Sequence, residues 1–209
     1  MDPFADALES PDELAALYEP ASERAWAKDI GVLDEAARAL VAASPLVVVA
    51  SQDADGRADA TPRGGPAGFV TVLDDHHLAI PDATGNRRLD TLRNVIATGH
   101  VGLLFLIPGR DQTLRVNGRA RVTAAPEVLA AAGAVGNPPR TAIVVAADEV
   151  YAHCPKAFVR SKLWDPATWP EPGTVPSAAA VMLAHGRDPS RTLAEEQEYL
   201  DEALRSRLA

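Results

Sequence analysis

Hydrophobic positions follow a helical period at both ends of the chain and a strand-like pattern in its centre. In residues 10–19, SPDELAALYE, Ser10 precedes Glu13 by three positions, which is typical of a capping box at a helix start. A second helix is predicted over residues 32–42. The C-terminal stretch SRTLAEEQEYLDEALRSRL has the spacing of an amphipathic helix. The chain is therefore expected to begin and end in helices.

Short β-branched runs follow one another between these helices. The run PLVVVASQ leads into DADGR, whose Asp-Gly pair is a hairpin signal. Residues 58–82 hold three more strand-length pieces, and residues 100–109, 112–124 and 140–154 hold one each. Only one helix, beginning at Arg87, is expected to interrupt them. This order does not alternate strand and helix as a doubly wound sheet does, so it favours an antiparallel barrel with helices at its ends.

The length of 209 residues suits one domain, with an N-terminal helical arm over residues 1–43 packed on a barrel domain over residues 44–209. The longest apolar runs have strand length, so no membrane partner is expected. The N-terminus is acidic and lacks the basic start of a signal peptide. With Cys154 as the only cysteine, no intrachain disulfide can form, and the simplest interpretation is a cytoplasmic protein.

The net charge of −9 is concentrated in the two ends of the chain. Residues 1–35 carry −8 and residues 188–209 carry −3, which leaves the middle with +2. An acidic chain of this kind is not expected to bind nucleic acid. A mildly basic middle is compatible with a small anionic ligand and equally with an ordinary solvated surface.

The stretch PDATGNRRLDTLRN has arginines where a helix normally has acids. A helical pattern runs through Leu89, Leu92, Val95 and Ile96, and it makes Asn86 the expected N-cap. Arg87 and Arg88 then fall in the first turn, where the macrodipole favours negative groups. Two cations beside free backbone N–H groups would suit a phosphate. The alternative is that they pair with the nearby Asp82 or Asp90.

Three further groups of arginines and lysines fit either a ligand or a plain solvated surface. Arg63 precedes two glycines that allow a tight turn or the close approach of a ligand. In TLRVNGRARV, Arg115 shares a strand face with the two later arginines unless the Asn-Gly pair forms a bulge. Lys156 and Arg160 share a helix face next to Trp164. Such a group could bind a planar anion, or the cations and the aromatic ring could simply cap the helix.

No cluster of side chains in the sequence identifies a metal site or a catalytic centre. His153 and Cys154 are adjacent, but no other His or Cys cluster could complete a metal site. No Ser/His/Asp arrangement and no HExxH motif is present. Catalytic residues therefore remain unassigned, and no metal is expected.

Four segments stand in an order that resembles the pyridoxamine 5′-phosphate oxidase-related flavoproteins, in particular a bacterial subgroup of FMN-dependent enzymes. They are TPRGGPAGFVTVLDDHHLAIPDATGNRRLDTLRNV, VGLLFLIPG, TLRVNGRARV and HCPKAFVRSKLW. The resemblance implies a mainly β, α+β fold: a six-stranded antiparallel split β-barrel of the FMN-binding type with flanking helices. It also implies a homodimer with flavin sites at the subunit interface.

The same resemblance suggests which residues hold FMN. Arg87, Arg88 and Asn86 would hold the phosphate, with Arg63 as a further contact. The backbone of Ile80, Pro81 and Asp82 would run along the flavin ring. Residues from the partner subunit would close the pocket, namely Arg115, Val116, Lys156, Arg160 and Trp164.

The sequence departs from the pyridoxamine 5′-phosphate oxidases at its C-terminus. Their C-terminal segment carries a Trp and an Arg that recognise the vitamin, whereas this chain ends in an acidic helix with Arg205 and Arg207 near its tip. The expected function is an FMN-dependent oxidoreductase that transfers hydride between a small organic molecule or reduced nicotinamide and an acceptor. The alternatives are an F420-dependent enzyme of the same barrel, a haem-related role, and a noncatalytic flavin-binding module.

Overall fold

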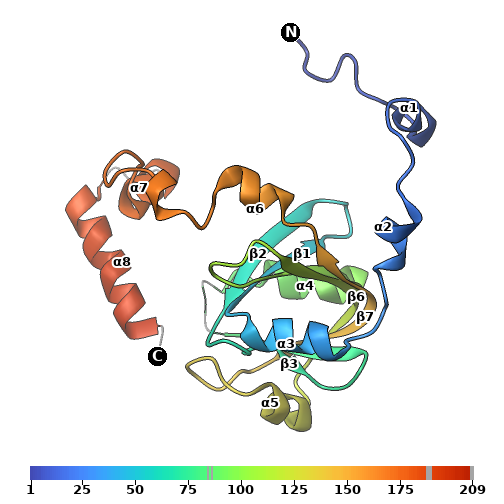
Figure 1. The fold of residues 1–209 in the computed structure, drawn as a ribbon. Coiled ribbons are helices and arrows are strands. Elements are labelled where there is room, and N and C mark those ends of the chain that lie inside the picture. The colour runs from blue at the N-terminus through green and yellow to red at the C-terminus, as the bar shows by residue number, and fades with distance from the viewer. Residues whose placement is uncertain (84, 86, 187–189, 208–209) are drawn as a thin grey trace.

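Seven antiparallel strands form one sheet, which is the centre of the molecule in Figure 1. The computed structural model describes residues 1–83, 85, 87–186 and 190–207. The strand order is β2-β1-β5-β6-β7-β4-β3, so β7 lies between its sequence neighbour β6 and the earlier strand β4. This α+β sheet is consistent with the expected split barrel, although it has seven strands where the family resemblance implied six.

The N-terminal region holds three helices, α1 (Pro11–Ala15), α2 (Glu23–Ala27) and α3 (Glu35–Ala43). The predicted capping box is present, since the Ser10 hydroxyl accepts a hydrogen bond from the backbone N–H of Glu13. The Glu13 carboxylate reaches back to the N–H of Glu9. Of these three helices only α3 buries side chains, Ala37 and Val41, whereas α1 and α2 bury none.

The first hairpin joins β1 (Leu46–Gln52) to β2 (Ala58–Gly64) across the predicted Asp-Gly turn. Gly56 in this turn has φ +84°, a conformation that glycine adopts without steric cost. The short strand β3 (Thr71–Val72) pairs with β4 (His77–Pro81), which then pairs with β7.

The long strands β5 (His100–Leu106), β6 (Thr113–Thr123) and β7 (Ala142–His153) complete the sheet. The β6–β7 register shifts at Asn117, and the extra residue is Asp148 on β7. Along β6 the exposed and buried positions therefore continue to alternate. The three arginines of this strand stay on one face, as expected without a bulge in β6 itself: Arg115, Arg119 and Arg121.

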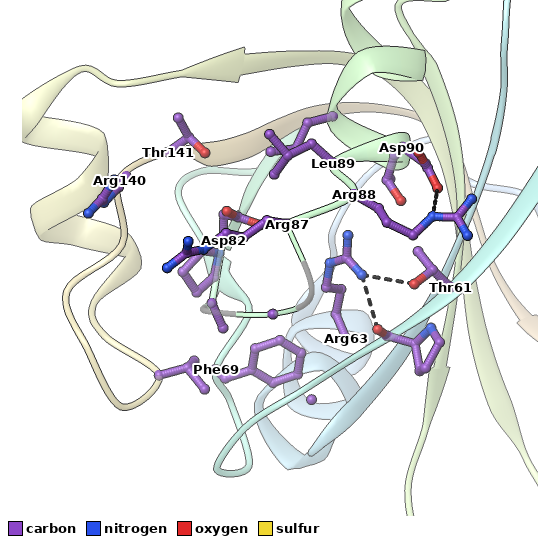
Figure 2. Close-up of a pocket in the computed structure, with 18 of the residues that line it drawn as sticks. Thr61, Arg63, Phe69, Asp82, Arg87, Arg88, Leu89, Asp90, Arg140 and Thr141 are labelled. Carbon is purple, nitrogen blue, oxygen red and sulfur yellow. Dashed lines mark hydrogen bonds and ion pairs between the residues drawn. The ribbon is translucent and has the colours of Figure 1, made fainter. Parts of the chain in front are cut away.

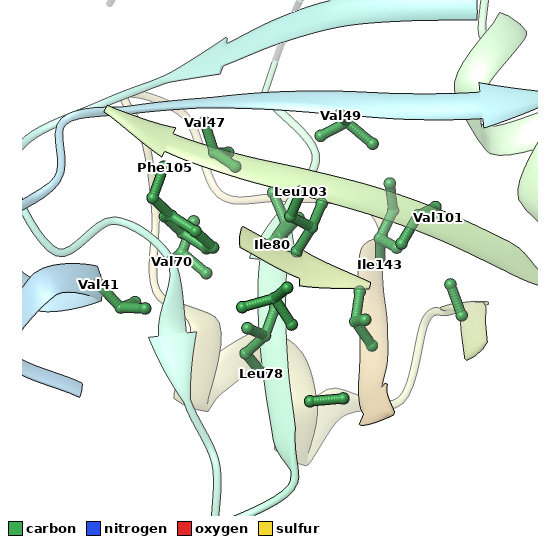
Figure 3. Close-up of a cluster of buried hydrophobic side chains, with 14 of the residues drawn as sticks. Val41, Val47, Val49, Val70, Leu78, Ile80, Val101, Leu103, Phe105 and Ile143 are labelled. Atoms are coloured by element: carbon green, nitrogen blue, oxygen red, sulfur yellow. The ribbon is translucent and has the colours of Figure 1, made fainter. Parts of the chain in front are cut away.

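The core contains the apolar side chains that alternate along these strands (Figure 3). Val47, Leu103 and Phe105 approach Leu78 and Ile80 from facing parts of the sheet, and all five are almost fully buried. Each such side chain contributes about 1.5–3 kcal/mol when it leaves water. The same alternation determines which side chains remain on the outer face.

Helices interrupt and follow the strands more often than the sequence predicts. Helix α4 (Asp90–Thr98) was expected, but α5 (Pro126–Ala132) also lies between strands, so the prediction of a single interrupting helix is wrong. After β7 come α6 (Lys156–Ser161), a 3₁₀ turn, α7 (Ala178–Gly186) and α8 (Leu193–Arg207). None of the helices in the described ranges is both long and apolar enough to cross a membrane.

Candidate functional site

An open groove of about 1360 Å³ lies between two strands that are far apart in the sheet (Figure 2). β2 supplies Thr61 and Arg63, and β4 supplies Pro81, although four strands separate β2 from β4 in the sheet order. The sheet must curl for both strands to line one groove. The other walls are the loop before α4, the first turn of that helix, and residues 135–141.

The loop that enters α4 differs from the prediction that the helix begins at Arg87. The helix begins at Asp90, after Leu89 with φ +59°, and Arg87 itself has φ +62°. Two left-handed residues cannot continue a right-handed helix, so both Arg87 and Arg88 precede the first turn. Asp90 then occupies the position that the macrodipole favours for an acid. Asn86, the predicted N-cap, lies outside the described residues.

Two non-glycine residues in the left-handed region make this loop locally strained. Each conformation costs about 1–2 kcal/mol for a residue with a side chain. Such strain persists where surrounding structure enforces it and is concentrated at ligand-binding sites. Here it holds Arg87 and Leu89 on the wall of the groove.

The side chains that line the groove include four arginines and three aspartates. Arg63 donates to the hydroxyl of Thr61 and to the carbonyl oxygen of Pro62, and in Figure 2 it points across the groove toward the loop before α4. Arg88 is paired with Asp90, Nε to Oδ2, at 2.7 Å. For Arg87 and Arg140, no described side chain or carbonyl bonds the guanidinium group.

The start of α4 leaves backbone donors available at the same place. Leu89 occupies the N-cap position and has no side-chain oxygen to accept from the first turn. Within the described ranges, no acceptor is found for the N–H groups of Asp90, Thr91 and Leu92, all of which line the groove. Free amides beside arginines form a site suited to a phosphate or another anion.

Asp82 lies just after β4 and introduces a negative charge among these cations. Its backbone N–H donates to the carbonyl oxygen of Thr141 at 2.9 Å, which fixes the end of the strand. Partial burial raises the pKa of the Asp82 carboxyl, and the nearby Arg63 guanidinium opposes part of that rise. Asp82 is therefore easier to protonate than an ordinary surface aspartate.

A buried polar network lies under the groove. The hydroxyl of Thr91 donates to Asp59 Oδ2 at 2.9 Å, and the Ser51 hydroxyl donates to the same oxygen at 3.3 Å. Asn94 donates its amide to the Ser51 hydroxyl at 3.0 Å. Through these bonds α4 is tied to β1 and β2, so the network fixes where the first turn of α4 stands relative to Arg63.

The glycine pair after Arg63 has a packing role in this structure. A Cβ on Gly65 would lie 2.8 Å from the Cβ of Phe69, closer than side chains tolerate. Phe69 is buried and forms part of the groove wall. The close approach at Gly65 is therefore to an aromatic side chain of the chain itself.

The remaining predicted residues do not line this groove in a single chain. Ile80 is a core side chain with 1% exposure, and Val116 is fully buried. Lys156 and Arg160 are exposed on α6, and Trp164 donates its indole N–H to the carbonyl oxygen of Arg110. Their predicted role requires a second subunit, so it stays a prediction.

Arg115 belongs to a separate cluster on the outer face of β6 and β7. It donates to the Tyr151 hydroxyl at 2.9 Å, and Lys28 lies over the same ring, 5.0 Å from its centroid. His153 is close by, and its Nδ1 is buried without a hydrogen-bond partner among the described residues. Burial lowers the pKa of His153, as do the Arg115 and Lys28 charges.

Sequence reasoning missed two parts of the groove, Arg140 and the Asp59–Thr91 pair. Arg140 lies two positions before the start of β7 and reaches the groove because β7 pairs with β4. Asp59 and Thr91 are 32 positions apart. Neither residue type gives a local sequence signal at these positions, so the contact could be identified only from the pairing of distant segments.

One known protein family matches the part of the chain that forms the sheet. The family model described as pyridoxamine 5′-phosphate oxidase matches residues 33–154, which is more than half of the sequence. The chain belongs to the pyridoxamine 5′-phosphate oxidase family. The match contains Arg63, Asp82, Arg87, Arg88 and Arg140, whereas α1, α2 and all helices after β7 lie outside it.

Several solved structures are similar to somewhat more than half of this chain. HupZ from Group A Streptococcus is 18% identical with a TM-score of 0.48, covering 57% of this chain and 92% of its own. A candidate pyridoxamine 5′-phosphate oxidase from Lactobacillus delbrueckii is 26% identical with a TM-score of 0.47, covering 59% and 98%. HutZ, the heme storage protein from Vibrio cholerae, is 11% identical with a TM-score of 0.39, covering 58% and 93%. A search of curated proteins found no match.

Proposed function

We propose that the groove binds FMN and that the protein is an FMN-dependent oxidoreductase working as a homodimer. The observation that carries this proposal is the meeting of Arg63, Arg87, Arg88 and Arg140 with the uncapped start of α4. Cations and free amides at one place can neutralise a phosphate dianion and donate hydrogen bonds to its oxygens. Membership of the pyridoxamine 5′-phosphate oxidase family supports a flavin as the molecule that carries the phosphate.

Each groove residue has a defined part in this proposal. Arg87 binds the phosphate most directly because none of its described neighbours bonds it, while Asp90 holds Arg88 in place at the helix start. Arg63 reaches the same region from β2. The backbone from Ile80 to Asp82, together with Asn86, completes the binding surface of one subunit.

The second subunit supplies the other wall in this proposal. Arg115, Val116, Lys156, Arg160 and Trp164 lie away from the groove of their own chain and would approach the flavin of the partner. When bound, FMN supplies the hydride chemistry. Donors such as Arg115 or Lys156 would stabilise negative charge on the reduced ring.

The substrate is proposed to be a small molecule other than pyridoxine or pyridoxamine phosphate. The end of the chain is α8, whose first turn is acidic with Glu195 and Glu196. An acidic helix of this kind is not suited to bind a phosphorylated vitamin. Either reduced nicotinamide or an organic substrate could act as hydride donor, and no general acid or base is assigned.

The test is the visible spectrum of the purified protein before and after addition of FMN. We expect the absorption bands of bound oxidised flavin, and an Arg87→Ala/Arg88→Ala variant that retains much less FMN after gel filtration. Reduction of the bound flavin by a nicotinamide or substrate would establish the oxidoreductase. Bound flavin that no reductant turns over would indicate a binding module. A protein that ignores FMN but binds F420 or haem would contradict the proposal.

A further inference from the structure

The first 27 residues do not pack into the barrel of their own chain. We call residues 1–27 the free N-terminal segment; its helices α1 and α2 bury no side chain. The chain is attached only beyond this segment, where Ile30 donates to the carbonyl oxygen of Val150 and Asp29 accepts from the Val150 N–H. Large apolar side chains stand in solvent along the segment: Phe4, Leu8, Leu14, Leu17, Tyr18 and Trp26.

The surface area of the single chain is too large for a compact monomer. The accessible surface is 14200 Å² for a mass of 22.0 kDa. A compact monomer of this mass exposes about 9300 Å². The excess in one chain, about 4900 Å², is larger than the 1000–2500 Å² that each partner of a stable, obligate dimer buries, roughly half of the total interface area. A single chain therefore leaves more surface unburied than an obligate dimer interface requires.

The surface that best complements the free N-terminal segment is the segment after β7. We call residues 156–169 the α6 segment. Its first nine residues carry three cations and no acid, whereas the free N-terminal segment carries seven acids and one base. None of the described ion pairs involves Lys156, Arg160 or Lys162, and none involves the seven acids.

The α6 segment also exposes apolar area next to these cations. Val159 is 56% exposed, and Leu163 and Trp169 are similarly open. An exposed apolar patch bordered by charge is typical of a protein-binding surface. The opposite charge of the two segments would guide their encounter, and the aromatic side chains of one would cover the aliphatic side chains of the other.

We propose that the free N-terminal segment of one copy docks on the α6 segment of a second copy. In Figure 1, α1 and α2 lead away from the barrel and stand well apart from the α6 of their own chain. An exchange between copies buries both surfaces at once, and in a two-fold dimer it does so twice. This inference rests on the dimer of the proposed function but not on its cofactor.

The single cysteine allows a direct test. Cys154 is exposed and precedes α6 by two residues. A tagged Ala16→Cys/Cys154→Ser chain is co-expressed with the untagged natural chain, and the mixture is treated with a short bismaleimide. Only a link between position 16 of one copy and Cys154 of the other joins one tagged chain to one untagged chain. We expect this species, with its intermediate size, on a denaturing gel.

Matched variants establish that the contact is specific. Val159→Glu in the untagged chain adds a charge that repels the acidic segment, and it should lower the yield of the mixed species severalfold. Val175→Glu is the same substitution at an equally exposed position, 59%, outside the α6 segment, and it should leave the yield unchanged. Absence of the mixed species, or an equal loss in both variants, would overturn the proposal. The flavin spectrum of the same sample separates this result from a failure of FMN binding.

Discussion

Thr91, in the first turn of α4, donates its hydroxyl hydrogen to Oδ2 of Asp59 on β2 over 2.9 Å. The donor is almost fully buried, and without its hydroxyl the Asp59 oxygen would keep only the longer bond from Ser51, at 3.3 Å. The pair links the strand that carries Arg63 to the helix whose start lies beside Arg87. Stability and the geometry of the groove are therefore coupled at this hydrogen bond.

Thr91→Val keeps the shape of the side chain and removes the hydroxyl. We expect a loss of about 1–2 kcal/mol in the free energy of unfolding, because the shorter of the two hydrogen bonds to the Asp59 carboxylate is removed while that from Ser51 remains. Thermal unfolding should show a lower Tm, and FMN titration should show weaker binding. Thr91→Ser keeps the hydroxyl and is the control, so equal losses in both variants would point to packing instead.

Arg87→Gly should change stability and binding in opposite directions. Glycine adopts φ +62° without the cost of a side chain, so the free energy of unfolding should rise by about 1 kcal/mol. FMN affinity should fall roughly 10- to 100-fold with the loss of a charged hydrogen bond. Leu89→Gly relieves the same kind of strain and keeps the cation. It should stabilise the protein and lose much less affinity than Arg87→Gly.

Asp82→Asn should raise both stability and FMN affinity at neutral pH. The pKa of Asp82 in the folded protein lies above its usual 3.8, so the unfolded chain loses this proton at a lower pH. The free energy of unfolding therefore falls as the pH rises from 3.8 to the pKa of the folded protein. The stability gain of the variant should therefore shrink as the pH falls toward 3.8. Removing this negative charge near the phosphate should strengthen FMN binding by about 1 kcal/mol, which corresponds to roughly fivefold higher affinity. An unchanged pH profile would contradict this role.

His153 should make the protein less stable in mild acid. Its folded pKa lies below the usual 6.5, so the unfolded chain takes up the proton more readily and the free energy of unfolding decreases as the pH drops below 6.5. His153→Gln should flatten this dependence in chemical unfolding measured between about pH 7 and 5. Lys28→Ala removes one of the two cations and should flatten it in part.

Gly118→Ala should be among the most damaging single substitutions in the sheet. An added Cβ would collide with the backbone carbonyl of Ala146 beside the β6–β7 register shift, and a backbone atom in a sheet cannot move aside cheaply. We expect a loss of about 3 kcal/mol or more, or failure to fold. Gly186→Ala has open space around its Cβ position and should be close to neutral in the same thermal assay.

Local patterns predicted several strands because buried positions alternate with more exposed ones along β1, β5 and β6. The β-branched run of β1, the Asp-Gly hairpin and the alternation along β6 are all visible in the sequence. Arg63, Arg87 and Arg88 could be predicted as ligand-binding candidates because a glycine-rich turn or an expected helix start adjoins them, whereas Asp82 followed from the family resemblance. Their predicted contacts with FMN remain to be tested by the spectrum and the variants above.

The parts that the sequence did not predict depend on distant or nonperiodic features. Helix α7 is apolar on nearly all sides, so it lacks the amphipathic period that identifies a surface helix. The start of α4 was placed three residues early because the left-handed conformations of Arg87 and Leu89 leave no mark on residue type. Arg140 reaches the groove only through the pairing of β7 with β4.

The strand order also determines when the groove can exist during synthesis and folding. β4 has no long neighbour until β7 has been made, since its other partner β3 has only two residues. The two groove walls are therefore brought together by one of the latest and most non-local pairings in the chain, the kind that forms slowly. A nascent chain released only as far as β6 already contains Arg63, Arg87 and Arg88, but it lacks both Arg140 and the pairing that brings the two walls of the groove together. A ligand that bridges the two walls would act on the last step of folding and slow the first step of unfolding.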